Sequence, residues 1–240
     1  AKVFHNASPA REFTAVRAYL DEHTGKEETE ILRSYAAGLL CHYALDSAAH
    51  PFVYASVDYF LAKKILKAHS AVAHNAIEYG LDVEILFQKF RVRPHMFPPR
   101  YLFSEEPRLL EIQAGLMKHT LAQIAGVMVK RKKIIEAYRD TARVCRFFHD
   151  PHYRKRRVFH ALERPVGANL AVSSLIYPKE LPDGLDFANR QGREWVEGRQ
   201  ESFFEIYENA VQSAADLMAA FFAGRELSGL TLPNYKGITV

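Results

Sequence analysis

Two trios of ionisable side chains repeat at intervals of four residues: His42, Asp46 and His50, and then His74, Glu78 and Asp82. Residues four apart share one face of a helix, so each trio forms a polar stripe. Apolar residues flank both stripes, and burying ionisable groups is costly unless they pair or bind a metal. Imidazole and carboxylate ligands suit zinc, and also iron or manganese. The spacing therefore predicts metal ligands on two facing helices, with a buried hydrogen-bonded network or a solvated helix face as the alternatives.

Helix geometry limits how these ligands can be shared. His42 and His50 would lie about 12 Å apart along a straight helix, too far to hold one ion with bonds of about 2.1 Å. The simplest division gives His42 and Asp46 to one ion. A second ion takes His50, His74 and Glu78, so two metals are predicted. Asp82 is better placed as an outer acceptor that orients a neighbouring His.

The hydrophobic pattern has a helical period through most of the chain and shows almost no strand alternation. It predicts one all-α domain over residues 1–240. A helix should open at Pro9 with Ser8 as its N-cap, and Pro51 should end the second helix. Further helices are expected at about 30–50, 56–90, 107–128, 130–148, 153–162 and 201–222.

Composition excludes several classes of protein. Of the 240 residues, 48% are apolar and 25% charged, which is typical of a globular chain rather than a disordered or fibrous one. Two cysteines are too few for a disulfide framework, and no apolar run is long enough to span a bilayer. The chain begins at Ala1 with no visible leader. We expect a processed or trimmed chain of cytoplasmic, bacterial origin, with secretion as the alternative if a leader was removed.

Positive charge is concentrated in one segment. Residues 130–157 hold eleven Lys or Arg against three acids, within a net charge of +4 for the whole chain. Such a segment can attract an anionic membrane surface or a nucleic-acid backbone. The alternative is an ordinary solvated helix face.

The stretch Gly-Leu-Leu-Cys-His-Tyr-Ala-Leu-Asp-Ser-Ala-Ala-His-Pro over residues 38–51, followed by His-Asn-Ala-Ile-Glu over 74–78, resembles the core of the zinc-dependent phospholipase C family. That family includes bacterial phosphatidylcholine-hydrolysing enzymes and the catalytic domain of clostridial alpha-toxin, and the S1/P1 nucleases are its structural relatives. The metal motif covers about residues 35–82, and the later segments 193–195 and 201–204 resemble the smaller bacterial members more loosely. The resemblance implies an all-α, phospholipase C/P1 nuclease-like bundle.

Carried over residue by residue, the resemblance implies that His42 and Asp46 bind one zinc ion and that Asp46 bridges to another. The ligands of a further zinc would be His50, His74 and Glu78, which matches the division argued from helix rise. The family supplies one more upstream His to the first zinc, and His5 is the candidate. Two or three zinc ions are implied in all, with Asp46 as the candidate catalytic residue.

Three departures from the family pattern matter. The interval from Asp46 to His50 is shorter than in the secreted toxins. The family's amino-terminal Trp is missing, since the only tryptophan is Trp195. The upstream His and the Gly-Pro-Asp segment, whose Asp binds metal, have no match before His5. We therefore expect either that the amino-terminal part of the family domain is missing from this chain or that the site is reduced and inactive.

The leading hypothesis is a zinc-dependent phosphodiesterase of phospholipase C type, in which zinc-bound hydroxide attacks phosphorus. Its partner would be a phospholipid or another phosphodiester. The first alternative is a single-strand nuclease of S1/P1 type. An HD-type phosphohydrolase would need an adjacent His-Asp pair, which occurs only at His149 and Asp150, before a proline. The last alternative is a non-catalytic helical domain that binds metal and docks a membrane or a protein.

Overall fold

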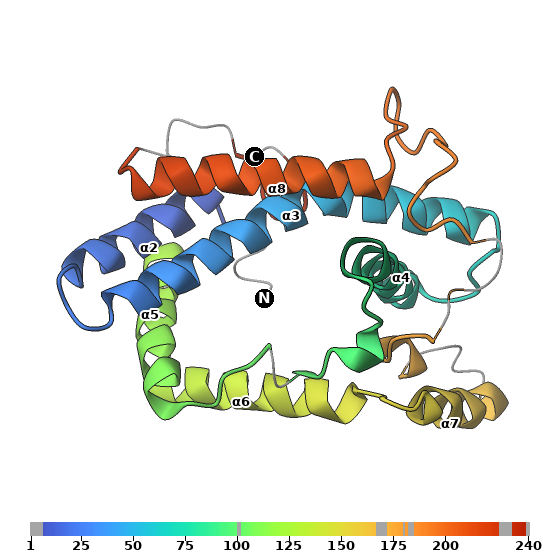
Figure 1. Cartoon of the computed structure of the whole chain (residues 1–240), viewed down its shortest axis with the longest axis horizontal. Coiled ribbons are helices and arrows are strands. Elements are labelled where there is room, and N and C mark those ends of the chain that lie inside the picture. The colour runs from blue at the N-terminus through green and yellow to red at the C-terminus, as the bar shows by residue number, and fades with distance from the viewer. Residues whose placement is uncertain are drawn as a thin grey trace. The chain divides into compact units, whose positions relative to one another are not determined.

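The computed structural model describes residues 7–99, 102–166, 172–179, 181, 185–225 and 232–238. In this part of the chain the regular secondary structure is helical throughout and no strand occurs, so the predicted all-α class is confirmed. The α-helices are α2 (Pro9–Glu22), α3 (Thr29–Ala62), α4 (Ser70–Phe90), α5 (Pro107–Ala125), α6 (Arg131–Phe148), α7 (Arg154–Glu163) and α8 (Phe203–Phe222) (Figure 1). Among these helices, none combines the length and apolarity needed to cross a membrane.

The chain divides into two compact units. Unit 1 comprises Ala1–His50, Ser104–Thr141 and Tyr207–Val240, and unit 2 comprises Pro51–Phe103 and Ala142–Ile206. Three of the four dividing points fall inside the continuous helices α3, α6 and α8, and the fourth, between Phe103 and Ser104, falls in the segment before α5. No sharp shift in composition marks these points in the sequence.

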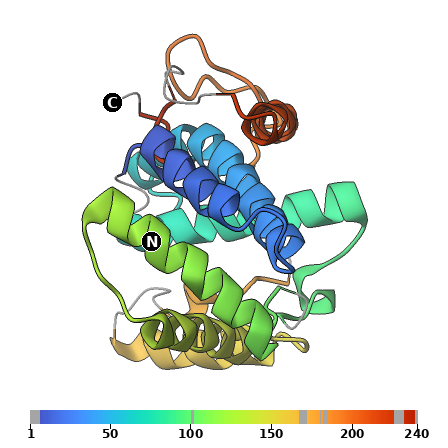
Figure 2. The same cartoon turned by 90° about the vertical axis from the view of Figure 1, so that its left-hand side faces the viewer.

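The core of unit 1 forms around α2. Phe13 and Val16 of α2 are each 1% exposed, and they pack in one cluster with Leu40 of α3, Leu116 of α5 and Phe221 of α8. Figures 1 and 2 show α2 lying against α5, and Arg11 of α2 donates a hydrogen bond to the main-chain oxygen of Gln123. This packing fixes the first half of α3, which carries His42, Asp46 and His50.

Helix α3 contains the largest departure from the predicted elements. Pro51 was expected to end it, but the helix continues for eleven more residues to Ala62. Phe52 and Val53 are buried immediately after the proline, and Val57 and Phe60 follow on later turns. Burial of these apolar side chains offsets the cost of a proline inside a helix, about 3 kcal/mol. Tertiary packing therefore overrides the local signal.

The predicted single helix over residues 56–90 is also wrong, because α3 and α4 are separated by residues 63–69. Lys64 takes a left-handed conformation with a φ of 56°. The main-chain N–H groups of Ile65 and Leu66 both fold back onto the oxygen of Phe60. This pattern closes the end of α3, and it does so without the glycine that usually marks such a turn.

The other expected helices lie close to their predicted bounds. Helix α2 starts at Pro9 with Ser8 at the N-cap, as predicted. Helix α5 begins at Pro107, where the side chain of Glu106 accepts hydrogen bonds from two N–H groups of the first turn. Helices α6, α7 and α8 each begin within two residues of the expected position.

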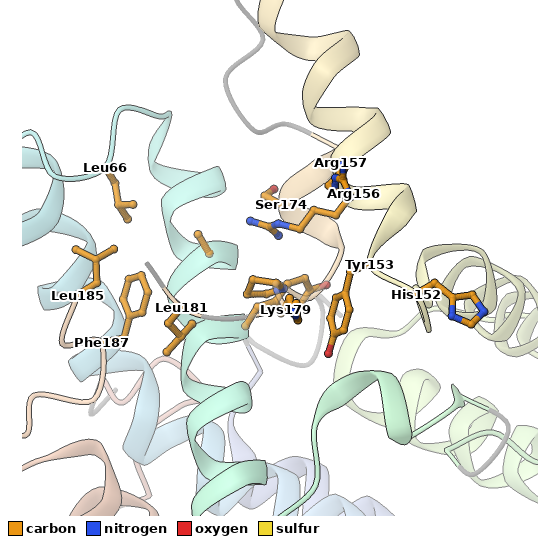
Figure 3. Close-up of a pocket in the computed structure, with 13 residues that line it drawn as sticks. Leu66, His152, Tyr153, Arg156, Arg157, Ser174, Lys179, Leu181, Leu185 and Phe187 are labelled. Atoms are coloured by element: carbon orange, nitrogen blue, oxygen red, sulfur yellow. The ribbon is translucent and has the colours of Figure 1, made fainter. Parts of the chain in front are cut away.

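Aromatic side chains build the core of unit 2. The ring of Phe52 lies 5.3 Å from that of Trp195, and Phe60 lies 5.3 Å from Phe187, both edge to face. Gly80 of α4 lets Phe187 approach closely, since a Cβ atom at that position would lie 2.7 Å from the ring. Helix α4, helix α7 and described residues between Ser174 and Phe187 also line a cavity within this unit (Figure 3).

Candidate metal centre

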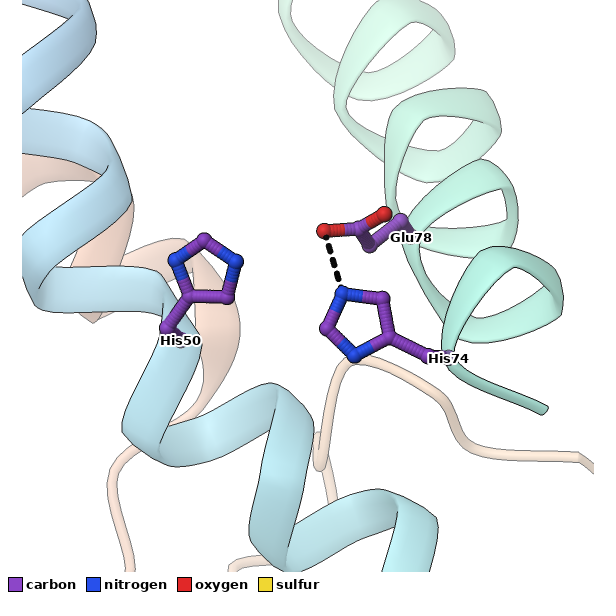
Figure 4. Close-up of side chains that lie close together, drawn as sticks. All are labelled: His50, His74 and Glu78. Atoms are coloured by element: carbon purple, nitrogen blue, oxygen red, sulfur yellow. Dashed lines mark hydrogen bonds and ion pairs between the residues drawn. The ribbon is translucent and has the colours of Figure 1, made fainter. Parts of the chain in front are cut away.

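Helices α3 and α4 bring together His50, His74 and Glu78. Each offers one ligand atom, and these atoms all lie within 4.8 Å of one another (Figure 4). Within the described ranges, this is the group of three potential ligands that meets that spacing. His50 directly precedes Pro51 inside α3, so the continuous helix sets its place opposite α4. The grouping is the one that helix rise predicted.

The ring of His50 is oriented by main-chain oxygens. Its Nδ1 atom lies 2.7 Å from the carbonyl oxygen of Tyr235 and 3.1 Å from that of Asp46. Because a carbonyl can only accept, Nδ1 must carry the proton and donate it. Nε2 is then the ring nitrogen that faces Glu78 and His74 (Figure 4), and in the neutral ring it is the atom that can bind a metal. A backbone acceptor behind the ring is the arrangement that orients metal-binding histidines.

His74 and Glu78 stand one turn apart on α4. Nε2 of His74 lies 3.0 Å from Oε1 of Glu78, and both side chains are only partly exposed. The ring of Tyr54 lies 5.4 Å from the ring of His74 and covers it from α3. The His74 ring therefore donates to the Glu78 carboxylate on the side of α4 that His50 faces (Figure 4), and a bound metal ion would take the place of the proton between them.

The donor set fits zinc. Two imidazoles and one carboxylate are a known ligand set for zinc sites that keep a fourth position open for water or substrate. With bonds of about 2.1 Å, two ligands of one ion lie at most about 4.2 Å apart. All the separations in the group are within 4.8 Å, so at most a small inward rotation of the side chains would bring the three atoms to that spacing. His74 and Glu78 are already close enough.

His42 and Asp46 lie beside this group on α3. Oδ2 of Asp46 lies 3.8 Å from Nε2 of His42 and 3.7 Å from Nδ1 of His50, so the carboxylate stands between the two histidines. The side chain of His42 is 56% exposed, and its ring lies 5.6 Å from that of Tyr235. The first predicted zinc thus has two described candidate ligands, because His5 lies outside the described residues.

Asp82 has a different hydrogen-bond partner from the one expected. Its Oδ2 atom accepts a hydrogen bond of 2.7 Å from the hydroxyl of Tyr177. The role of Asp82 as an outer acceptor for a histidine stays a prediction.

In the His149–Asp150 pair of the HD-type alternative, the Asp150 side chain hydrogen-bonds to main-chain N–H groups. The Asp150 carboxylate accepts hydrogen bonds from the main-chain N–H groups of Arg154 and Arg156 at the start of α7. Asp150 is 7% exposed. A carboxylate placed this way stabilises the helix N-terminus, which explains an acid inside the basic segment 130–157.

Sequence reasoning did not identify Tyr235 and Tyr54 as neighbours of the site. Tyr235 lies in a segment with no hydrophobic period, and it acts through its main-chain oxygen, which any residue type carries. Tyr54 belongs to the part of α3 that follows the proline. Neither position carries a motif that could have revealed it.

Comparisons of the chain with protein-family models, with curated proteins and with solved structures found no match.

Proposed function

We propose that this protein is a metal-dependent phosphoester hydrolase of phospholipase C type, with zinc bound by His50, His74 and Glu78. The observation that carries the proposal is the meeting of these three side chains, with the proton of His50 directed away from the other two. The motif resemblance supplies the reaction class, and the arrangement supplies a suitable ligand set. The phospholipase C/P1 nuclease-like form of the bundle is part of this proposal.

The number of protein ligands, three rather than four, favours a catalytic over a structural zinc site. Structural zinc sites are closed by four protein ligands, whereas catalytic sites use three and leave one position for water or substrate. Zinc in such a site lowers the pKa of a bound water towards 7 and polarises a phosphoryl oxygen. Within the described ranges, the group supplies three ligands.

Each residue has a distinct task in this proposal. His74 and Glu78 bind the ion from one turn of α4, and His50 binds it from α3 through Nε2. Asp46, 3.7 Å from Nδ1 of His50, is the candidate ligand of a second ion with His42 and His5. The second ion stays a prediction, as does contact of segment 130–157 with an anionic membrane.

The first test is zinc content by elemental analysis after exposure to zinc and gel filtration. We expect at least one ion per wild-type chain and the loss of about one ion from the variant His74→Ala with Glu78→Ala. The matched control is His69→Ala, because His69 sits at the N-cap of α4 without a side-chain capping bond. Equal zinc content in all three proteins would refute the site.

The second test is hydrolysis by the zinc-loaded protein. Phosphatidylcholine in mixed micelles, single-stranded DNA and bis(4-nitrophenyl) phosphate should separate a phospholipase from a nuclease and from a general phosphodiesterase. We expect release of diacylglycerol, and we expect it to fall at least a hundredfold in Glu78→Gln and to be unchanged in His69→Ala. Zinc binding without turnover of any of the three would instead support a non-catalytic metal-binding domain.

A further inference from the structure

Unit 2 contains a cavity of about 570 Å³ that is separate from the metal centre. It is lined by Leu66, by residues of α4 and α7, and by described residues between Ser174 and Phe187 (Figure 3). Its volume falls within the range of small-molecule sites, about 300–1,000 Å³. Such sites combine mostly apolar walls with a few polar groups that fix the orientation of the ligand.

One side of the cavity is cationic. Arg156 and Arg157 of α7 line it together with Lys179, and no Asp or Glu occurs among its described lining residues. Arg156 is held in place because its Nη1 atom donates to the main-chain oxygens of Ser173, at 3.0 Å, and of Ile176. Burial lowers the pKa of Arg156, and the nearby carboxylate of Glu163 opposes that effect. The protein thus keeps a partly desolvated guanidinium at this wall.

The other side of the cavity is apolar. Leu66, Leu185 and Phe187 gather on the opposite side of α4 from the arginines (Figure 3). Phe187 is 3% exposed and packs edge to face on Phe60, so this wall belongs to the core of the unit. A ligand that filled the cavity would meet charge at one end and hydrocarbon at the other.

The cavity and the metal centre use different faces of α4. Ala76 lines the cavity and lies two residues from both His74 and Glu78. At about 3.6 residues per turn, a two-residue step leads to the opposite side of a helix. A ligand in the cavity would therefore not contact the proposed zinc ligands.

We propose that this cavity binds an amphiphilic anion, with its charged head against Arg156, Arg157 and Lys179 and its hydrocarbon chain against Leu66, Leu185 and Phe187. Arginine binds both carboxylate and phosphate oxygens through paired N–H groups. The shared chemistry is thus an acyl or alkyl chain that ends in a carboxylate or a phosphate. The inference does not depend on the proposed hydrolase activity.

The test is isothermal titration calorimetry on the full chain with four dissolved probes: dodecanoate and dodecyl phosphate, each below its critical micelle concentration, dodecanol below its solubility limit, and inorganic phosphate. We expect at least one of the two charged amphiphiles to bind at about one per chain. Dodecanol and inorganic phosphate should each bind at least tenfold more weakly. Comparison of the two charged probes identifies the preferred head group. Equal binding of dodecanol, or no binding of either charged amphiphile, would overturn the proposal.

Substitutions at the wall of the cavity, with controls elsewhere, show whether the charged probe binds in this cavity. Arg157→Gln with Lys179→Gln changes two exposed side chains, so folding should be preserved, and affinity for the charged probe should fall at least tenfold. Arg139→Gln removes an exposed cation of α6 that does not line the cavity, and it should leave the affinity unchanged. His74→Ala should also leave it unchanged, which separates this site from the metal centre. Equal losses in the double variant and in Arg139→Gln would show non-specific attraction and refute the site.

Discussion

The main-chain oxygen of Tyr235 lies 2.7 Å from Nδ1 of His50, although 185 residues separate them in the chain. The hydroxyl of the same tyrosine donates to both carboxylate oxygens of Glu12, at 2.9 and 3.0 Å. One residue thus joins a buried acid of α2 to the candidate zinc ligand of α3. The main-chain oxygen of Tyr235 orients His50, and its hydroxyl supplies the hydrogen bond that the buried carboxyl of Glu12 needs.

The substitution Tyr235→Phe separates these two contributions. It keeps the main-chain oxygen that accepts from His50, so zinc affinity should stay within about twofold of wild type. Losses of metal affinity of about 10–100-fold are expected only when such an acceptor is itself removed. It removes a donor to a buried carboxyl, which should lower the free energy of unfolding by about 1–3 kcal/mol. Zinc titration and urea denaturation measure the two effects. A tenfold loss of zinc affinity without a loss of stability would contradict this division of roles.

Glu12 should make the stability of the fold depend on pH. It is fully buried, and burial raises its pKa from 4.5 to about 7, although the hydroxyl of Tyr235 acts in the opposite direction. In the folded state Glu12 therefore keeps its proton up to about pH 7, whereas in the unfolded chain it releases the proton near pH 4.5. The associated stability is complete below pH 4.5 and is lost as the pH rises through 7, a change of about 3 kcal/mol.

Urea denaturation of wild type and Glu12→Gln between pH 5 and pH 8 tests this dependence. The variant cannot titrate at this position, so the difference in unfolding free energy between the two proteins should shift in favour of the variant by about 3 kcal/mol over this range. The control is Glu30→Gln, at an exposed position of α3. Parallel pH profiles for wild type and Glu12→Gln would show that the carboxyl does not titrate in this range.

Regular local signals explain why much of the fold could be predicted. Helices α2 and α5 begin at Pro9 and Pro107 because proline suits the first helical turn. His74 and Glu78 share a face of α4 because they are four residues apart, and helix rise assigned His50 to the same group. These inferences need only the geometry of a single helix.

Features that no residue type marks, or that depend on distant parts of the chain, could not be predicted. Lys64 turns the chain between α3 and α4 in a conformation that glycine usually takes, so no residue type marks the turn. The acceptor behind His50 is a main-chain oxygen, which the identity of Tyr235 does not reveal. Arg156, Leu66 and Phe187 line one cavity only because segments far apart in sequence fold around α4.

Pro51 should reduce the stability of α3. A proline inside a helix lacks the N–H that would bond to the oxygen four residues earlier, and its ring crowds that turn, at a cost of about 3 kcal/mol. Pro51→Ala restores the donor while the buried Phe52 and Val53 stay in place. We expect the free energy of unfolding to rise by about 1–2 kcal/mol, less than the full cost because the existing packing has adapted to the ring. Urea denaturation measures the change, and a clear loss of stability would show that the ring makes essential contacts.

Two helical glycines should respond in opposite directions to the same substitution. A Cβ at Gly80 would lie 2.7 Å from Cδ2 and 3.1 Å from Cε2 of Phe187, a ring held against Phe60. Gly80→Ala should therefore lower the free energy of unfolding by about 1–3 kcal/mol through overpacking. At Gly38 of α3 a Cβ would meet nothing within 4 Å. Gly38→Ala should raise the free energy of unfolding by up to about 1 kcal/mol, because alanine favours the helix. Urea denaturation of both variants measures the contrast. Equal effects would show that Phe187 moves aside and that the wall of the cavity it forms is not rigid.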